Sequence, residues 1–135
     1  MEINIHIECK KLDTDYSLAF KEYQKRISPW CKLNLINYKD ISNISFKKGS
    51  RIFYVTAGTN TISSTELADL IKDINLASMS CIDFVILPDR HMDLKEKGEF
   101  FFLSSFDLDN NLLYVALAEQ LYRAYTIQNN ITYHK

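Results

Sequence analysis

Segments with the period of a β-strand alternate along this chain with segments that have the period of an α-helix. Residues 2–8 (EINIHIE) carry isoleucine at every second position, which is typical of a strand with one apolar face. Residues 51–56 (RIFYVT) are apolar on both faces, as is expected of a strand that is covered on both sides. Further strands are expected over about 31–38, 81–87 and 100–106.

Three helices are expected between or after these strands. One spans roughly 15–27, because its apolar residues have helical spacing and Pro29 disfavours helical geometry in the residue before it. Ser63 and Glu66 form a capping box ahead of a second, amphipathic helix. The longest helix is expected over about 111–128. Strands that alternate with helices predict an α/β fold, with a mostly parallel sheet between helical layers.

Composition and charge exclude several classes of protein. The chain is 47% hydrophobic and 13% aromatic, so it can bury a core and is not intrinsically disordered. Its formal charge of −1 excludes a uniformly basic nucleic-acid binder. Residues 1–51 nevertheless carry +4 and residues 52–135 carry −5, a distribution that permits one basic face. No apolar run approaches the roughly 20 residues of a membrane span, and no leader opens the chain, so we expect a cytoplasmic protein.

Glycine is scarce, with Gly49, Gly58 and Gly98 the only three in the chain. Glycines scattered in this way form neither a GxGxxG turn nor a phosphate-binding P-loop. The three cysteines are odd in number and share no CxxC spacing, which is typical of reduced, mostly buried thiols. The two commonest glycine-based nucleotide sites are therefore excluded.

No metal site is predicted. The histidines His6, His91 and His134 are too dispersed for a zinc site, and His6 is interpreted as a surface or edge residue of an alternating strand. Residues 107–111 (DLDNN) begin like a calcium loop, but Leu112 stands where the sharp turn needs glycine.

The carboxyl-terminal stretch has the most distinctive side chains. Glu119, Tyr122 and Arg123 are three and four residues apart, so they share one helical face and the two charges can pair. The chain then closes on residues 133–135, Tyr-His-Lys, an aromatic ring with two potential cations. On local grounds alone, a solvated, frayed tail is the favoured interpretation.

These residues carry a family resemblance. The ending LLYVALAEQLYRAYTIQNNITYHK resembles the carboxyl end of the ribosomal RNA large subunit methyltransferase H family, whose members share E-x-x-Y-R-A and finish in Tyr-His-Lys or Tyr-His-Arg. FKEYQKRISPWCKLNLI resembles its first helix and second strand, and RIFYVTAGTNTISSTELADLI its third strand and the next helix. Residues 39–50, which have no sustained period and are expected to form a loop, are shorter than in typical members. The resemblance covers nearly the whole chain and implies a single domain over residues 1–135.

The family belongs to the SPOUT class, and the resemblance implies both a fold and an activity. It implies a parallel α/β sheet whose carboxyl-terminal part is threaded as a trefoil knot, an exception to the general absence of knots. It implies a homodimer that binds S-adenosylmethionine and methylates N3 of a pseudouridine in the 23S rRNA of assembled ribosomes. A nearly neutral protein can act on such a substrate through shape and a local basic face.

The resemblance also assigns the site residues. Arg123 would bind a phosphate or an interface carboxylate, and His134 would act as a base or orient one, together with Tyr133 and Lys135. The cofactor would be bound by nine residues: Val55, Leu87, Pro88, Ser104, Ser105, Phe106, Asp107, Leu108 and Asp109.

The sequence departs from the family where glycines and a histidine are usual. Residues 87–91 read LPDRH in place of Gly-Gly-Pro/Ser-x-Gly, residues 108–110 read LDN in place of Leu/Phe-Pro-His, and Tyr114 replaces an arginine. Glycines let a ligand approach the backbone, and proline removes an N–H donor. Two hypotheses follow: an active methyltransferase, or a catalytically degenerate homodimer that binds RNA, a ribosomal particle or a protein, with side chains filling its cofactor site. A third, weaker hypothesis is that residues 89–91 recognise a different nucleotide.

Overall fold

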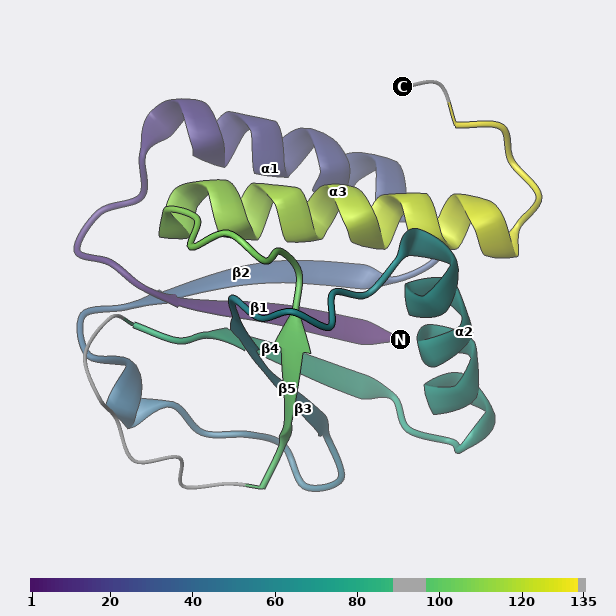
Figure 1. Ribbon diagram of the computed structural model, residues 1–135, viewed down its shortest axis with the longest axis horizontal. Helices are drawn as coiled ribbons and strands as arrows, with labels where there is room; N and C mark the ends of the chain where they lie inside the picture. Colours follow the sequence, from purple (N-terminus) through teal and green to yellow (C-terminus); the bar gives the residue numbers. More distant parts are fainter. Residues whose placement is uncertain (89–96, 134–135) are drawn as a thin grey trace.

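A five-stranded parallel sheet forms the centre of the computed structural model, which describes residues 1–88 and 97–133 (Figure 1). The spatial order is β2-β1-β4-β3-β5, and all four neighbouring pairs are parallel. The strands are β1 (Glu2–Glu8), β2 (Lys32–Tyr38), β3 (Arg51–Thr56), β4 (Cys81–Ile86) and β5 (Glu99–Phe102). The predicted α/β class with a parallel sheet is thus confirmed.

In the described part of the chain three α-helices accompany the sheet, and local caps set where they begin. They are α1 (Thr14–Ile27), α2 (Ser64–Leu76) and α3 (Asn110–Gln128), with a short 3₁₀ helix, η1, at Ile41–Asn43. The predicted capping box is present, because the Ser63 hydroxyl accepts from the Glu66 backbone N–H while the Glu66 carboxylate accepts from the Ser63 N–H. None of the helices that the structure describes combines the length and apolar composition needed to cross a membrane.

All three α-helices lie on one face of the sheet, with α3 between α1 and α2 (Figure 1). The prediction of helical layers on both faces was wrong, and the handedness of the crossovers explains why. The steps β1-α1-β2 and β3-α2-β4 move in the same direction across the sheet, so right-handed connections place both helices on the same face. The step from β2 to β3 moves the opposite way, so its connection over residues 39–50 runs along the other face.

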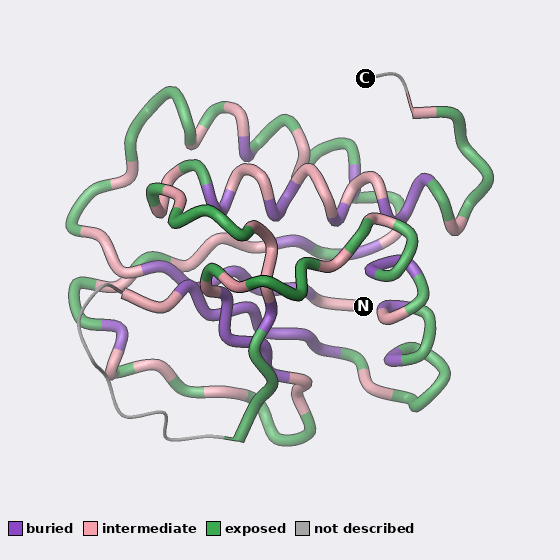
Figure 2. The backbone as a smooth tube through the Cα atoms, in the orientation of Figure 1, coloured by how far each residue is buried: buried purple, intermediate pink, exposed green. Residues whose placement is uncertain are grey.

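Buried residues concentrate on the sheet and on the inner sides of the helices (Figure 2). Ile3, Ile5 and Ile7 of β1 are fully buried beneath the helices. On the opposite face the connection over 39–50 contributes Ile41 to a smaller apolar cluster. Strand β3 is therefore covered on both sides, as its composition predicted, although helices cover only one of the two faces.

That opposite face also holds a polar cluster, which we define as Asn4, His6, Tyr38, Ser50 and Asp83. His6 is only 2% exposed, so its interpretation as a surface or edge residue was wrong. Its Nε2 lies 2.7 Å from Asp83 Oδ1 and its Nδ1 lies 2.8 Å from the Tyr38 hydroxyl oxygen. The reason is that residues 39–50 cover the face that the alternation of β1 left polar.

Strand β5 is shorter than expected, because the chain leaves the sheet after Phe102 rather than continuing to residue 106. Beyond this point it contacts the loop that follows β3. The Gly58 N–H donates to the Ser104 carbonyl at 3.2 Å, and the Ile62 N–H donates to the Phe102 carbonyl at 3.2 Å. A Cβ at Gly58 would lie 2.3 Å from the Phe102 ring, so this contact requires glycine. The linker between β5 and α3 is thereby held against the β3–α2 loop.

Candidate functional site

The carboxyl ends of the central strands enclose a pocket of about 440 Å³, which we call the strand-end pocket. Parallel α/β sheets bind ligands at this edge, where connections diverge. The pocket is lined by the ends of β3 and β4, by the linker after β5 and by the first turn of α3. Its lining residues are Val55, Thr56, Ala57, Leu87, Pro88, Ser104, Phe106, Asp107, Leu108, Asn110 and Leu113.

Seven of the nine residues that the sequence assigns to a cofactor line this pocket. The exceptions are Ser105 and Asp109. Ser105 is exposed, and the Asp109 carboxylate caps α3 by accepting from the Asn111 N–H at 3.0 Å. The structure therefore places Asp109 at the helix start rather than in the pocket wall.

Four lining residues were absent from the expected set: Thr56, Ala57, Asn110 and Leu113. Thr56 ends β3, and Ala57 follows it directly. Their signal in the sequence is positional, because residues at the carboxyl end of a central parallel strand border this kind of site. Asn110 and Leu113 enter the lining because α3 begins there.

Two of the residues that replace the family's glycines, Leu87 and Pro88, line the strand-end pocket without filling it. Leu87 and Pro88 both contribute to its wall, and the Leu87 N–H donates to the Val55 carbonyl at 3.3 Å. Tyr114, by contrast, lies in the core, fully buried against the ring of Phe20. Its replacement of arginine is therefore not a change in the pocket lining. Residues 89–91 fall outside the described part of the chain.

A second group of residues lies near the far end of α3. The Arg123 Nε donates to the Glu119 carboxylate at 3.0 Å, and its Nη2 also donates to that carboxylate, as the helical spacing predicted. The Arg123 guanidinium lies 4.5 Å from the centre of the Tyr133 ring, within range of a cation–π contact. Burial, reinforced by the nearby Glu119 charge, raises the pKa of Tyr133 to about 12. His134 and Lys135 lie outside the described residues.

We call this group the Arg123 cluster (Glu119, Tyr122, Arg123 and Tyr133). Glu119 lines a cavity that shares Ser104 and Leu108 with the strand-end pocket, but Arg123 lies further along α3. Asn110 lines the pocket at the start of α3, and Arg123 follows it by thirteen residues. At about 1.5 Å per residue, the two ends are roughly 20 Å apart along the helix. Within one chain the structure does not bring the two predicted sets of site residues together.

Other reactive groups offer little chemistry of their own. Cys31 is buried, and burial raises the pKa of its thiol to about 11, which keeps it protonated at neutral pH. In residues 1–88 and 97–133, no three His, Cys, Asp or Glu side chains gather closely enough to hold a metal ion. At the strand-end pocket itself, Ser104 and Asp107 are polar lining residues.

Comparison with known proteins gives one family over almost the whole chain. Residues 1–134 match the family model described as predicted SPOUT methyltransferase. The chain is 33% identical over 138 residues to ribosomal RNA large subunit methyltransferase H 1 of Thermoanaerobacter sp. (strain X514), with all of both chains covered. It is 35% identical over 159 residues to ribosomal RNA large subunit methyltransferase H of Clostridium novyi (strain NT), covering 98% of this chain and all of that one. A third relative, ribosomal RNA large subunit methyltransferase H of Metamycoplasma arthritidis (strain 158L3-1), is 29% identical with both chains fully covered.

Proposed function

The chain belongs to the SPOUT methyltransferase family, with relatives named ribosomal RNA large subunit methyltransferase H, and from this premise we propose that it methylates N3 of a pseudouridine in 23S rRNA. The methyl donor is S-adenosylmethionine, residues 1–135 form one domain, and the protein acts in the cytoplasm. The observation that carries this proposal is the strand-end pocket, which is open although Leu87 and Pro88 replace glycines.

The pocket fits a cofactor of this kind in size and character. Its volume of about 440 Å³ falls within the roughly 300–1,000 Å³ of typical small-molecule sites. Val55, Leu87 and Leu108 offer apolar contacts, while Ser104 and Asp107 offer hydrogen-bonding groups. Bound there, S-adenosylmethionine would supply an electrophilic methyl group on a sulfonium.

A trefoil knot in the carboxyl-terminal half is part of the proposal. It is supported by the strand order, in which β5 lies beyond β3, and by the contact between the two loops that would cross. Gly58 and Ile62 of the β3–α2 loop are hydrogen-bonded to Ser104 and Phe102 of the β5–α3 linker. Ala57 of the first loop and Ser104 of the second line the strand-end pocket, so the crossing would shape the cofactor site.

The active form is a homodimer in which each site takes residues from both subunits. The distance of roughly 20 Å along α3 supports this, because one chain alone cannot place Arg123 at its own strand-end pocket. The outward side of α3 supplies a surface for the partner. Leu112 and Ile127, near its two ends, are each 41% exposed, and Val115 and Ala116 between them are half-buried.

The Arg123 cluster then serves the neighbouring subunit's cofactor. Glu119 fixes the guanidinium of Arg123, which would hold an rRNA phosphate beside the reacting base. His134 would take the N3 proton or orient the group that does, and Lys135 would add positive charge next to it. Holding the base and the methyl donor in line lowers the barrier through positioning.

Binding of S-adenosylmethionine tests the proposal directly. We expect calorimetric titration of the full chain to give micromolar affinity, and Ser104→Phe, which fills the strand-end pocket, to abolish it. Thr65→Phe, at an exposed position of α2 outside the pocket, is the matched control and should bind as the unmodified chain does. No binding by the unmodified chain at millimolar concentration would favour the degenerate homodimer instead.

Transfer of labelled methyl groups to ribosomes that lack the modification tests the catalytic residues. Arg123→Ala and removal of residues 133–135 should each reduce transfer at least a hundredfold while S-adenosylmethionine still binds. Arg26→Ala is the matched control, because Arg26 makes the same type of helical pair with Glu22 on the exposed side of α1. Transfer that survives both changes would contradict the roles assigned to these residues.

A further inference from the structure

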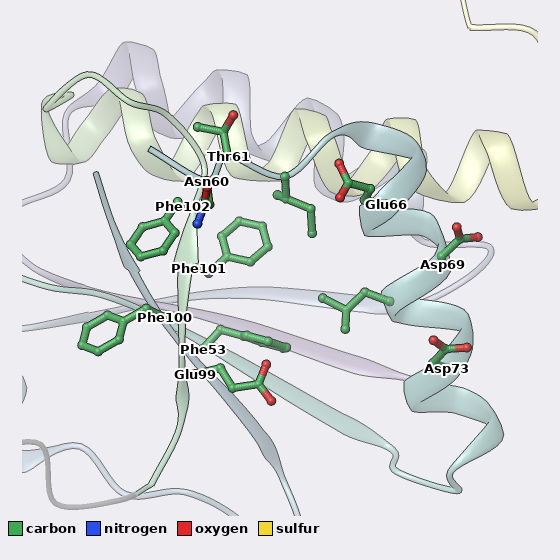
Figure 3. Close-up of a pocket in the computed structure, with 12 residues that line it drawn as sticks. Phe53, Asn60, Thr61, Glu66, Asp69, Asp73, Glu99, Phe100, Phe101 and Phe102 are labelled. Atoms are coloured by element: carbon green, nitrogen blue, oxygen red, sulfur yellow. The ribbon is translucent and has the colours of Figure 1, made fainter. Parts of the chain in front are cut away.

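A groove with a volume of about 670 Å³ lies between α2 and β5 (Figure 3). We call it the α2–β5 groove. None of its lining residues lines the strand-end pocket. Phe53, Leu70 and Phe101 form an apolar floor, and the figure shows Phe100 and Phe102 on the other side of β5 from Phe101.

Carboxylates surround this apolar floor. Glu66, Asp69 and Asp73 lie three and four residues apart along α2, so they line one side of the groove, while Glu99 stands at the base of β5 (Figure 3). No lining residue is basic. Glu66 is occupied by the capping box, and Glu99 pairs with Arg51. The groove therefore has a negative potential over an apolar base.

Two of the carboxylates have no counter-charge in the described part of the chain. Asp69 and Asp73 are both exposed, and neither makes a hydrogen bond or an ion pair through its side chain with any residue that the structure describes. Across the groove from them, Phe100 of β5, the outermost strand of the described sheet, is 55% exposed (Figure 3). A groove with free carboxylates along one wall and aromatic rings along the other suits an extended ligand that carries both positive charge and apolar side chains.

We propose that the α2–β5 groove binds an extended protein segment that is rich in lysine or arginine and also carries apolar side chains. The cations would meet Asp69 and Asp73, and the apolar side chains would contact Phe100 and the floor. The free carboxylates of Asp69 and Asp73 disfavour a phosphate backbone as occupant. The outermost position of β5 suits an extended segment that runs alongside the strand.

Our identification of the protein that supplies the segment rests on the proposed function, whereas the proposal that the groove binds such a segment does not. Proteins that bind nucleic acid commonly carry basic arms. An enzyme that modifies rRNA within a ribosomal particle meets such arms beside its substrate. The groove would then hold the enzyme on the particle through a protein, while the basic amino-terminal part of the chain faces phosphate.

The probe is a fluorescein-labelled peptide of alternating lysine and leucine, about ten residues long, which spans roughly 33 Å when extended. Its binding to the full chain is followed by fluorescence anisotropy. Asp69→Asn combined with Asp73→Asn removes the free carboxylates, and Phe100→Ala removes the exposed ring. Asp15→Asn combined with Glu22→Gln is the matched control, because it changes the net charge equally at exposed positions of α1.

We expect saturable binding that the groove double variant weakens about tenfold, the control double variant leaves unchanged and added salt weakens. Phe100→Ala should weaken it as well. No saturable binding by the unmodified chain, or equal weakening by the two double variants, would overturn the proposal. Displacement of the peptide by oligouridylate would do so too, since RNA would then occupy the groove.

Two further measurements distinguish peptide binding in the groove from dimerisation through the groove and from S-adenosylmethionine binding. Sedimentation should give the same mass for the groove double variant and the unmodified chain, and a lower mass would overturn the proposal by making the groove an interface between copies. S-adenosylmethionine titration of the same variant should be unchanged. If the unmodified chain binds S-adenosylmethionine but not the peptide, the groove proposal alone fails. If it binds the peptide but not S-adenosylmethionine, the proposed function alone fails.

Discussion

Replacement of Asp83 by asparagine tests the polar cluster on the sheet face opposite the helices. The Asp83 carboxylate accepts hydrogen bonds from His6 Nε2 at 2.7 Å, from Asn4 Nδ2 at 3.1 Å and from the Ser50 hydroxyl. A hydrogen bond to a charged group contributes about 1.5–3 kcal/mol and one between neutral groups about 0.5–1.5 kcal/mol. Since asparagine keeps the shape and loses the charge, the three differences of roughly 1 kcal/mol predict a loss of about 3 kcal/mol at pH 7.

The same carboxylate predicts how that loss depends on pH. Burial alone would raise the pKa of Asp83, but hydrogen bonds from His6, Ser50 and Asn4 outweigh it and lower the pKa below its ordinary value of 3.8. A pKa lowered by folding contributes stability that is complete above the unfolded value, about 3.9, and is lost as the pH falls through the folded value. The difference between the unmodified chain and Asp83→Asn should therefore shrink below about pH 4.

Urea denaturation followed by far-ultraviolet circular dichroism measures both effects, at one protein concentration because association would alter apparent stability. Asp73→Asn, an exposed change of the same type, is the control and should leave the midpoint unchanged. A loss below about 1 kcal/mol at pH 7, or an equal loss at about pH 3, would show that the charge of Asp83 does not hold the cluster together.

Three further changes test the loop contact and two titratable side chains. Gly58→Ala should destabilise the chain by about 1–3 kcal/mol in urea denaturation, because its Cβ would overlap the Phe102 ring; an unchanged midpoint would mean that the two loops separate freely. Iodoacetamide should label half-buried Cys9 well before Cys31, whose pKa burial raises to about 11, and equal rates in peptide mass spectrometry would contradict this. Comparison of ultraviolet pH titrations of the unmodified chain and Tyr133→Phe should place ionisation of Tyr133 near pH 12, against about 10 for a free ring.

Most strands and helices were predicted correctly because the interactions that define them involve residues close together in the sequence. Strand β3 has the expected bounds, since RIFYVT is apolar throughout and is flanked by residues that do not continue it. Helix α2 starts where its capping box predicted, because Ser63 and Glu66 bond to each other's backbone. Strand β5 was predicted too long: FFFLSSF returns to an apolar residue at Phe106 after two serines, yet Phe106 is 75% exposed, because the chain turns away to meet the β3–α2 loop.

Long-range contacts explain what the sequence did not reveal. Alternation in β1 put His6 on the polar side, and nothing nearby indicates that residues 39–50 would cover it. The candidate site shows the same limit. Family resemblance led to seven lining residues of the strand-end pocket, but it did not distinguish Asp109, a helix cap, from the wall. Thr56 ends β3 as predicted, but its place in the pocket depends on β3 being a central strand of the folded sheet.

The length of α3 has a genetic consequence for the proposed dimer. If each catalytic centre combines one polypeptide's strand-end pocket with the other's carboxyl-terminal tail, two inactive variants can restore each other. Co-expression of Ser104→Phe chains with chains lacking residues 133–135 would assemble mixed pairs in which one centre has both intact halves. Such pairs should regain up to half of normal turnover, whereas either parent assembled with itself should have none.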